Sequence, residues 1–113
     1  VEQTAQASGG EGEFLLTAGY PPVINEERAT VFVRDALCEI MGKDMVIEIP
    51  DPVMGGEDFA YYMEKIPGSF FRLGIGDRPA LHNSRFDFND DAILHGMRAM
   101  TGIALRFLDK GLL

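Results

Sequence analysis

The sequence predicts an α/β fold, because three short strand-like runs alternate with segments of helical spacing. Hydrophobic residues make up 46% of the chain and charged residues 25%, which is the ordinary balance of a globular protein. With 113 residues, the chain is long enough for one domain at most. We therefore expect strands and helices around a modest core.

The first predicted strand ends at a proline pair. Residues 7–12 are rich in glycine and are typical of a turn or linker, so we expect a structured segment before them. Residues 13–18 are typical of a strand. The residues Gly19-Tyr20-Pro21-Pro22 end it, because proline donates no hydrogen bond to a sheet and restricts the residue before it. We predict a domain boundary at this point.

The middle of the chain predicts a helix, a strand and a shorter helix. Asn25 is a good N-cap for a helix over residues 26–41, in which apolar residues recur at helical spacing, and Gly42 is a suitable C-cap. Residues 45–49 alternate as a short strand that prolines close. Residues 59–66 then have the spacing of a short helix.

A third strand and a long final helix complete the pattern. Residues 69–73 are typical of a strand, and Asn89 is a second N-cap for a helix that Gly111 ends. We predict that the large apolar stripe of this helix is buried. Small residues at three-residue spacing would also let it approach a sheet or another helix closely. The stripe consists of Ile93, Met97, Met100, Ala104, Phe107 and Leu108, and the small residues are Gly96, Ala99 and Gly102.

Charge and hydropathy argue against several classes of partner. The net charge is -8 and no cluster of Lys or Arg is present, whereas a nucleic-acid surface needs concentrated positive charge. No apolar run approaches the roughly 20 residues that cross a bilayer, and residues 1–4 do not have the features of a signal peptide. We expect no nucleic-acid or membrane partner and a cytoplasmic location. The single Cys38 lies in a helical pattern and is expected to be a buried hydrophobe.

Two loops carry residues that core packing does not require. In the first, Gly55 and Gly56 would let a ligand approach the backbone, and Glu57 and Asp58 follow at the start of a helix. The local sequence alone favours a simpler interpretation, in which the glycines turn the chain and Glu57 or Asp58 caps the helix.

His82, in the second loop, is a candidate metal ligand. It stands beside the polar Asn83, and packing gives no obvious reason for its imidazole. The alternative is a surface residue, because a metal site needs three or four donors. His95 lies beside the apolar stripe of the last helix and is expected to be structural or solvent-facing.

Three motifs occur in a fixed order along the chain: GYPPVIN at residues 19–25, MGGEDF at residues 54–59, and LHN at residues 81–83 followed by FDFND at residues 86–90. Together they closely resemble the C-terminal third of the metallopeptidase family that contains hippurate hydrolases, N-acyl-amino-acid amidohydrolases and the plant auxin-conjugate hydrolases. The resemblance covers nearly the whole chain.

The resemblance implies a division into two parts. Enzymes of that family have an α/β catalytic domain, which holds a metal pair, and a smaller inserted lid domain, which often mediates dimerisation. Residues 1–18 would be the last helix and strand of the lid, and residues 19–113 the C-terminal part of the catalytic domain. The implied fold is the C-terminal half of a two-domain metallopeptidase catalytic domain.

The resemblance also assigns roles to site residues. His82 matches the last metal ligand of the family. The loop that lines the same pocket is matched by Gly55, Gly56, Glu57 and Asp58, and Asn83 is placed with them at the substrate pocket or behind the ligands. The general-base glutamate and the other ligands would lie upstream, so this segment holds no catalytic residue of its own. Cys38 does not match the metal-binding cysteine of the family.

The implied reaction is hydrolysis of the amide bond of N-acyl amino acids or small peptides by a metal-activated water. The implied cofactor is a pair of divalent ions, zinc, manganese, cobalt or nickel, and the implied assembly is a homodimer through the lid. One histidine cannot hold such a pair, so we expect the segment to be inactive alone. The alternative is a non-catalytic α/β module that dimerises through the strand edge at residues 14–18.

Overall fold

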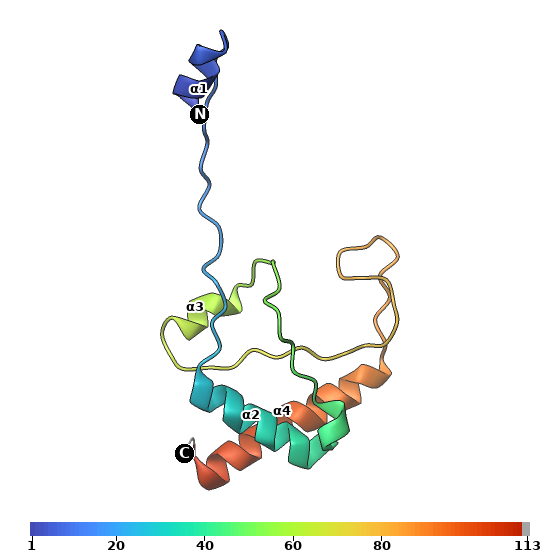
Figure 1. Ribbon diagram of the computed structural model, residues 1–113. Coiled ribbons are helices and arrows are strands. Elements are labelled where there is room, and N and C mark those ends of the chain that lie inside the picture. Colours follow the sequence, from blue (N-terminus) through green and yellow to red (C-terminus); the bar gives the residue numbers. More distant parts are fainter. Residues whose placement is uncertain (112–113) are drawn as a thin grey trace.

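The computed structural model describes residues 1–111 and consists of helices joined by long connections (Figure 1). A short helix near the N-terminus precedes a long connection, two longer helices lie together, and a short helix lies between them in sequence. The elements are α1 Glu2–Ala7, α2 Glu27–Met41, the 3-10 helix η1 Lys43–Met45, α3 Phe59–Met63 and α4 Asp91–Lys110.

The three predicted strands are absent from residues 1–111, so this part of the chain does not display the α/β arrangement. Residues 13–18 and 69–73 have no regular structure, and residues 45–49 begin in η1 and continue without a strand. A strand exists only when its backbone pairs with a neighbour, and apolar side chains here remain uncovered: Leu16 and Ile47 are each 83% exposed. The strand prediction was wrong for residues 1–111, because the three segments have no pairing partner within them.

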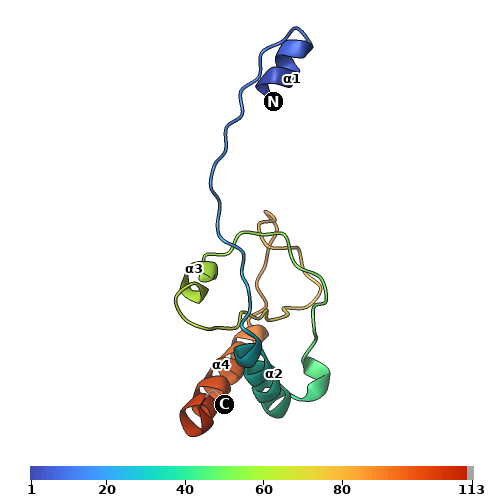
Figure 2. The same ribbon diagram turned by 60° about the vertical axis from the view of Figure 1, so that its left-hand side comes forward.

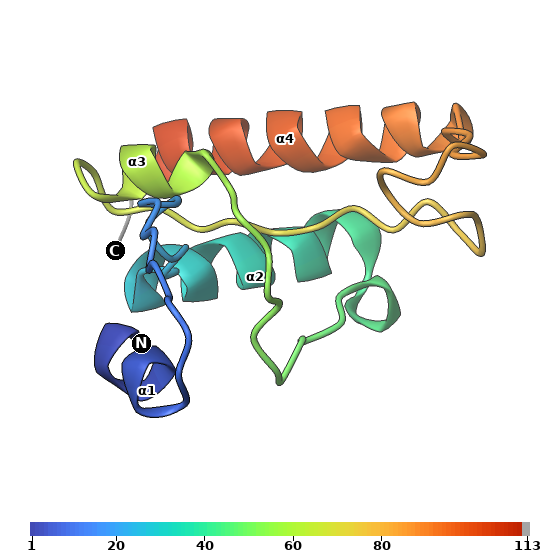
Figure 3. The same ribbon diagram turned by 90° about the horizontal axis from the view of Figure 1, so that it is seen from above.

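Helices α2 and α4 form the core of the molecule and lie side by side (Figure 3). Their contact is made by small side chains, since Ala29 and Ala36 of α2 and Ala92 and Ala99 of α4 are buried. An added Cβ at Gly102 would lie 3.0 Å from Ile40 Cγ1 and closer still to its Cδ1, so the helices approach closely there. The small-residue prediction for the last helix is confirmed.

The large apolar stripe of α4 is mostly exposed, contrary to the prediction that it is buried, although Phe107 at its end contacts α2. Met97 and Met100 are 62% and 60% exposed, and Phe107 is 48% exposed. The helix therefore buries its alanine and glycine face and leaves its bulky face uncovered. Within residues 1–111 no helix is both long and apolar enough to cross a membrane.

Aromatic and ionic contacts align the two helices. The rings of Phe32 and Phe107 meet edge to face with centroids 6.2 Å apart. Arg106 lies 5.7 Å from the centroid of Phe32 and forms an ion pair with Glu39. Hydrogen bonding to Arg106 lowers the pKa of Glu39, so the stabilisation from this pair is present at neutral pH and is lost as the pH falls through that lowered pKa.

Helix α2 begins one residue later than predicted. Its N-cap is Glu26, whose carboxylate accepts a hydrogen bond from the Ala29 N–H at 2.7 Å, and this bond is the largest cause of the lowered pKa of Glu26. The C-caps were predicted correctly: Gly42 and Gly111 end their helices with φ of 96° and 71°. Asp90 occupies the N-cap position of α4, and Asn89 Oδ1 accepts from the Asp91 N–H at 3.2 Å.

Asn25, which does not cap α2, joins two segments that are distant in sequence. Its Nδ2 donates to the Phe70 carbonyl at 3.0 Å, and its Oδ1 accepts from the Phe70 N–H at 2.8 Å. The Glu26 N–H also donates to the Gly68 carbonyl at 2.9 Å. The start of α2 is thereby tied to the segment that follows α3.

The molecule is extended rather than compact. Its radius of gyration is 20.2 Å, whereas about 13 Å is typical of a compact domain of this length. Helix α1 stands apart at the end of the long connection that leads to α2 (Figures 1 and 2). The helix expected at the start of residues 1–18 is present, and the strand expected after it is not.

Candidate functional site

His82 lies at the tip of a loop whose base is closed by an ion pair. Arg78 Nη1 donates to Asp87 Oδ2 at 2.8 Å, which joins the two arms of the loop. Within the loop, the Asn83 N–H donates to the Ala80 carbonyl at 3.1 Å and closes a tight turn. His82 occupies the third position of that turn.

The backbone of His82 adopts a left-handed conformation that side chains rarely take. Its φ is 67°, and it is the one residue other than glycine with a positive φ in residues 1–111. That conformation costs of order 1–3 kcal/mol and is concentrated at functional sites. The imidazole is exposed, and it makes no hydrogen bond or ion pair within the part of the chain that the structure describes. The loop thus presents a free imidazole at a strained position.

Asn83 shapes the loop around His82. Its Oδ1 accepts a hydrogen bond from the Arg85 N–H at 2.9 Å, and its carbonyl accepts one from the Phe86 N–H at 2.9 Å. Such bonds from an asparagine side chain to the backbone two residues on are typical of turns. Asn83 therefore fixes the chain direction directly after His82.

The glycine pair of the first loop divides into two different environments. An added Cβ at Gly56 would lie 2.8 Å from Tyr20 Cδ2, whereas nothing lies within 4 Å of such an atom at Gly55. The ring of Tyr20 also packs on Tyr61 of α3, with centroids 5.8 Å apart. Gly56 is accordingly required by the packing of Tyr20, and Gly55 is open to an approaching ligand.

The two carboxylates after the glycines also differ. Glu57 Oε1 accepts from the Phe59 N–H at 3.2 Å, which satisfies a free donor at the start of α3. Asp58 is the N-cap residue of α3, but its side chain makes no capping bond. The simpler interpretation of this loop, in which an acidic residue caps the helix, is therefore confirmed for Glu57.

The two candidate loops do not form a metal site by themselves. No group of three or more His, Cys, Asp or Glu side chains in residues 1–111 is placed to hold an ion. The first loop lies between η1 and α3, the second precedes α4, and the two are separate in Figure 1. Residues from elsewhere would be required to complete a site around His82.

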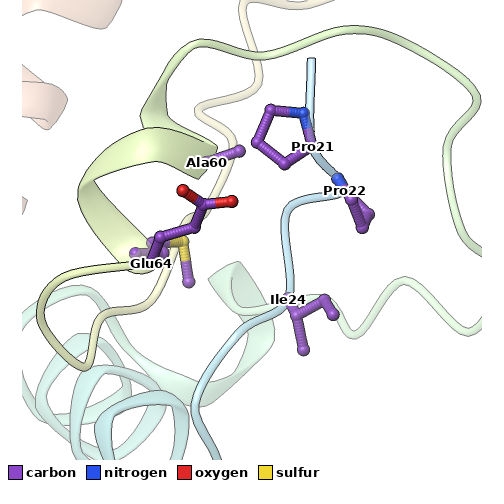
Figure 4. Close-up of a pocket in the computed structure, with 6 residues that line it drawn as sticks. Pro21, Pro22, Ile24, Ala60 and Glu64 are labelled. Carbon is purple, nitrogen blue, oxygen red and sulfur yellow. The ribbon is translucent and has the colours of Figure 1, made fainter. Parts of the chain in front are cut away.

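A surface pocket lies beside α3, and the sequence did not indicate it. It is mainly apolar, with a single carboxylate at its edge (Figure 4). Its walls combine the proline pair of the GYPPVIN motif with one face of α3. The only indication in the sequence was that the prolines belong to one motif and that α3 begins at the end of another, MGGEDF. The lining residues are Pro21, Pro22, Ile24, Ala60, Met63 and Glu64.

His95 is half-buried in α4, as expected of a structural residue. Its Nδ1 is inaccessible and makes no hydrogen bond within residues 1–111. Cys38 is a free thiol of intermediate exposure on α2, not the buried hydrophobe that was expected.

We expect Gly56→Ala to destabilise the complete protein by about 1–3 kcal/mol, because the new methyl group would displace the Tyr20 ring. Gly55→Ala, the matched control, should change stability by less than about 0.5 kcal/mol. Chemical denaturation measures both. Combining Gly56→Ala with Tyr20→Leu should recover part of the loss, and equal effects of the two alanine variants would contradict the Tyr20 contact.

Comparison with known proteins adds independent information about the chain. Residues 10–106 match the family model described as peptidase family M20/M25/M40. The N-acetyldiaminopimelate deacetylase of Enterococcus faecalis is 39% identical over 94 residues, which are 81% of this chain and 24% of that protein. The N-acetyl-L-cysteine deacetylase of Bacillus subtilis is 37% identical over 110 residues, which are 97% of this chain and 26% of that protein.

A further relative bears a different name. The putative glutamate–cysteine ligase 2-3 of Rhodococcus jostii is 38% identical over 95 residues, which are 80% of this chain but 12% of that protein. This chain therefore spans about a quarter or less of the length of these three relatives. No solved structure matches.

Proposed function

This chain belongs to peptidase family M20/M25/M40, and from that premise we propose that it is the C-terminal part of a hydrolase that cleaves the amide bond of N-acyl amino acids or small peptides. Two relatives are named as deacetylases of N-acetylated amino acids, which supports a small acylated amino acid as the substrate. The chain covers about a quarter of those proteins, so the rest of the active site would come from residues outside it.

The observation that carries the proposal is the presentation of His82. Its imidazole is exposed and unpaired within residues 1–111, and its backbone has a φ of 67° at the tip of a closed loop. Neutral imidazole is the commonest protein ligand for zinc-like ions. The donor chemistry of His82 therefore fits one ligand position of a divalent metal pair, and Zn²⁺, Mn²⁺, Co²⁺ and Ni²⁺ are the candidate ions. When bound, such a pair would polarise the amide carbonyl of the substrate and lower the pKa of a bound water molecule.

The MGGED loop would lie at the substrate side of the same site. Gly55 has open space around it, so a substrate could approach its backbone. The Asp58 side chain makes no capping bond and is free to interact with a group from outside residues 1–111. Glu57 and Gly56 would support the loop from behind, through the cap of α3 and the contact with Tyr20. Asn83 would hold the chain that follows His82.

The segments without a partner acquire a role in the same proposal. Residues 13–18, 45–49 and 69–73 would become strands of an α/β fold once the rest of the protein supplies neighbouring strands. Residues 1–18 would then belong to a lid domain, and the exposed side chains of Phe14, Leu15 and Leu16 support an apolar contact there, in the lid or between the two copies of a homodimer. Residues 19–113 would belong to the catalytic domain.

The test is an assay of the complete protein with a set of N-acetyl amino acids. We expect release of free amino acid and acetate in equal amounts, measured by quantifying the new amine and the acid. A complete, metal-supplemented protein that hydrolyses none of the set, nor any N-acyl compound with a larger acyl group, would overturn the proposal and favour a non-catalytic module.

A further inference from the structure

We propose that the ion pair between Arg78 and Asp87 is a positioning device that fixes where the loop presents His82. This inference rests on the proposed function, because it concerns how His82 would reach a metal ion. The resemblance assigns neither Arg78 nor Asp87 to metal binding or to the substrate pocket, and neither residue would touch the ion itself.

The arms of the loop are held together by side chains. Arg78 Nη1 donates to Asp87 Oδ2 at 2.8 Å, and further from the tip Asn89 Nδ2 donates to the Ile75 carbonyl at 3.3 Å. In residues 1–111, no backbone hydrogen bond joins residues 75–78 to residues 87–89. The shorter and stronger of the two contacts that define the base of the loop is therefore the charged one.

The Arg78–Asp87 pair can fix the position of His82 because the segment between the two residues is short and already folded into turns. Residues 79–86 contain the turn that carries His82 and the turn that Asn83 forms, so they have little freedom once their ends are fixed. Without the pair, the same turns would persist on arms that can separate. A metal ligand has to be held within about 0.5 Å of its productive position, and separating arms would exceed that tolerance.

The exposure of the pair distinguishes positioning from general stability. The side chains of Arg78 and Asp87 are 36% and 79% exposed, and ion pairs of that kind contribute little to global stability. Removing this pair should therefore leave the fold intact while it weakens metal binding. Arg34 on α2 is a matched control, because it forms exposed ion pairs with Asp35 at 3.1 Å and Glu48 at 3.8 Å away from the loop.

The experiment compares five variants of the complete protein: Arg78→Ala, Asp87→Ala, the exchange Arg78→Asp with Asp87→Arg, the control Arg34→Ala, and His82→Ala. Zn²⁺ is titrated into each metal-free protein, and the unfolding temperature is recorded. We expect Arg78→Ala and Asp87→Ala each to weaken Zn²⁺ binding roughly tenfold at an unchanged unfolding temperature. The exchange should restore most of the affinity, and Arg34→Ala should resemble the parent.

Each outcome discriminates. If His82→Ala weakens Zn²⁺ binding while Arg78→Ala and Asp87→Ala do not, the positioning inference fails and the proposed function stands. If His82→Ala binds Zn²⁺ as the parent does, His82 is not a metal ligand and this inference fails, whereas the hydrolysis assay decides the proposed function separately. If affinity and unfolding temperature fall in parallel in Arg78→Ala and Asp87→Ala, the pair serves stability alone and the inference is overturned.

Discussion

Replacing His82 by alanine in the complete protein is expected to reduce amide hydrolysis by more than about 100-fold and to lower the content of bound metal. Loss of a residue that merely supports a metal ligand costs roughly 10–100-fold, so loss of a ligand should cost at least as much. His82 suits this role because its imidazole is exposed, is unpaired within residues 1–111 and lies at a strained turn. Turnover and metal analysis of the same preparation measure the two effects together.

His95→Ala is the matched control for that variant. His95 lies within α4 with its Nδ1 inaccessible, so its replacement should affect packing but neither metal content nor turnover per folded molecule. The unfolding temperature of each variant separates a local loss from a general one. A His82→Ala protein with full metal content and normal turnover would contradict the assignment of His82 as a metal ligand.

The isolated segment of residues 1–113 is expected to hydrolyse no N-acyl amino acid. Residues 1–111 bring no three metal-binding side chains together, and a catalytic ion needs three protein ligands beside its water. The measurement is amine release by the purified segment with added Zn²⁺ or Mn²⁺, and the complete protein is the positive control. Metal-dependent turnover by the segment, retained after removal of trace host hydrolases, would contradict the prediction.

The local features of the helices could be predicted from the sequence, because they depend on neighbouring residues. Gly42 and Gly111 end their helices as expected, with positive φ at each. The N-cap of α2 differs by one residue because the amide of Asn25 is engaged by Phe70, a partner 45 positions away that no local pattern reveals. The boundary was thus decided by a long-range contact.

Strands and buried faces depend on packing partners, and residues 1–111 do not supply them. Residues 13–18 have the composition of a strand, but in residues 1–111 they have nothing to pair with. The bulky stripe of α4 was expected to be buried, yet α4 approaches α2 with its small-residue face, through the buried Ala99 and through Gly102, which lies against Ile40. Met97 and Met100 consequently remain exposed.

The site was only partly predictable for a similar reason. His82 could be singled out because its loop offers no packing role for an imidazole, but its positive φ is a property of the folded turn. The requirement for glycine at residue 56 could not be foreseen, since it arises from Tyr20, which lies in another motif.

The two hydrogen bonds between Asn25 and Phe70 make this part of the chain sensitive to deamidation. Asparagine is among the thermolabile residues, and hydrolysis of its amide would turn Nδ2, which donates to the Phe70 carbonyl at 3.0 Å, into a carboxylate oxygen. Two acceptors would then face each other across that distance, while the bond from the Phe70 N–H to Oδ1 could persist. A single deamidation event would therefore replace one of the two Asn25–Phe70 hydrogen bonds by repulsion between two acceptors. The segment after α3 would then be held less firmly to the start of α2.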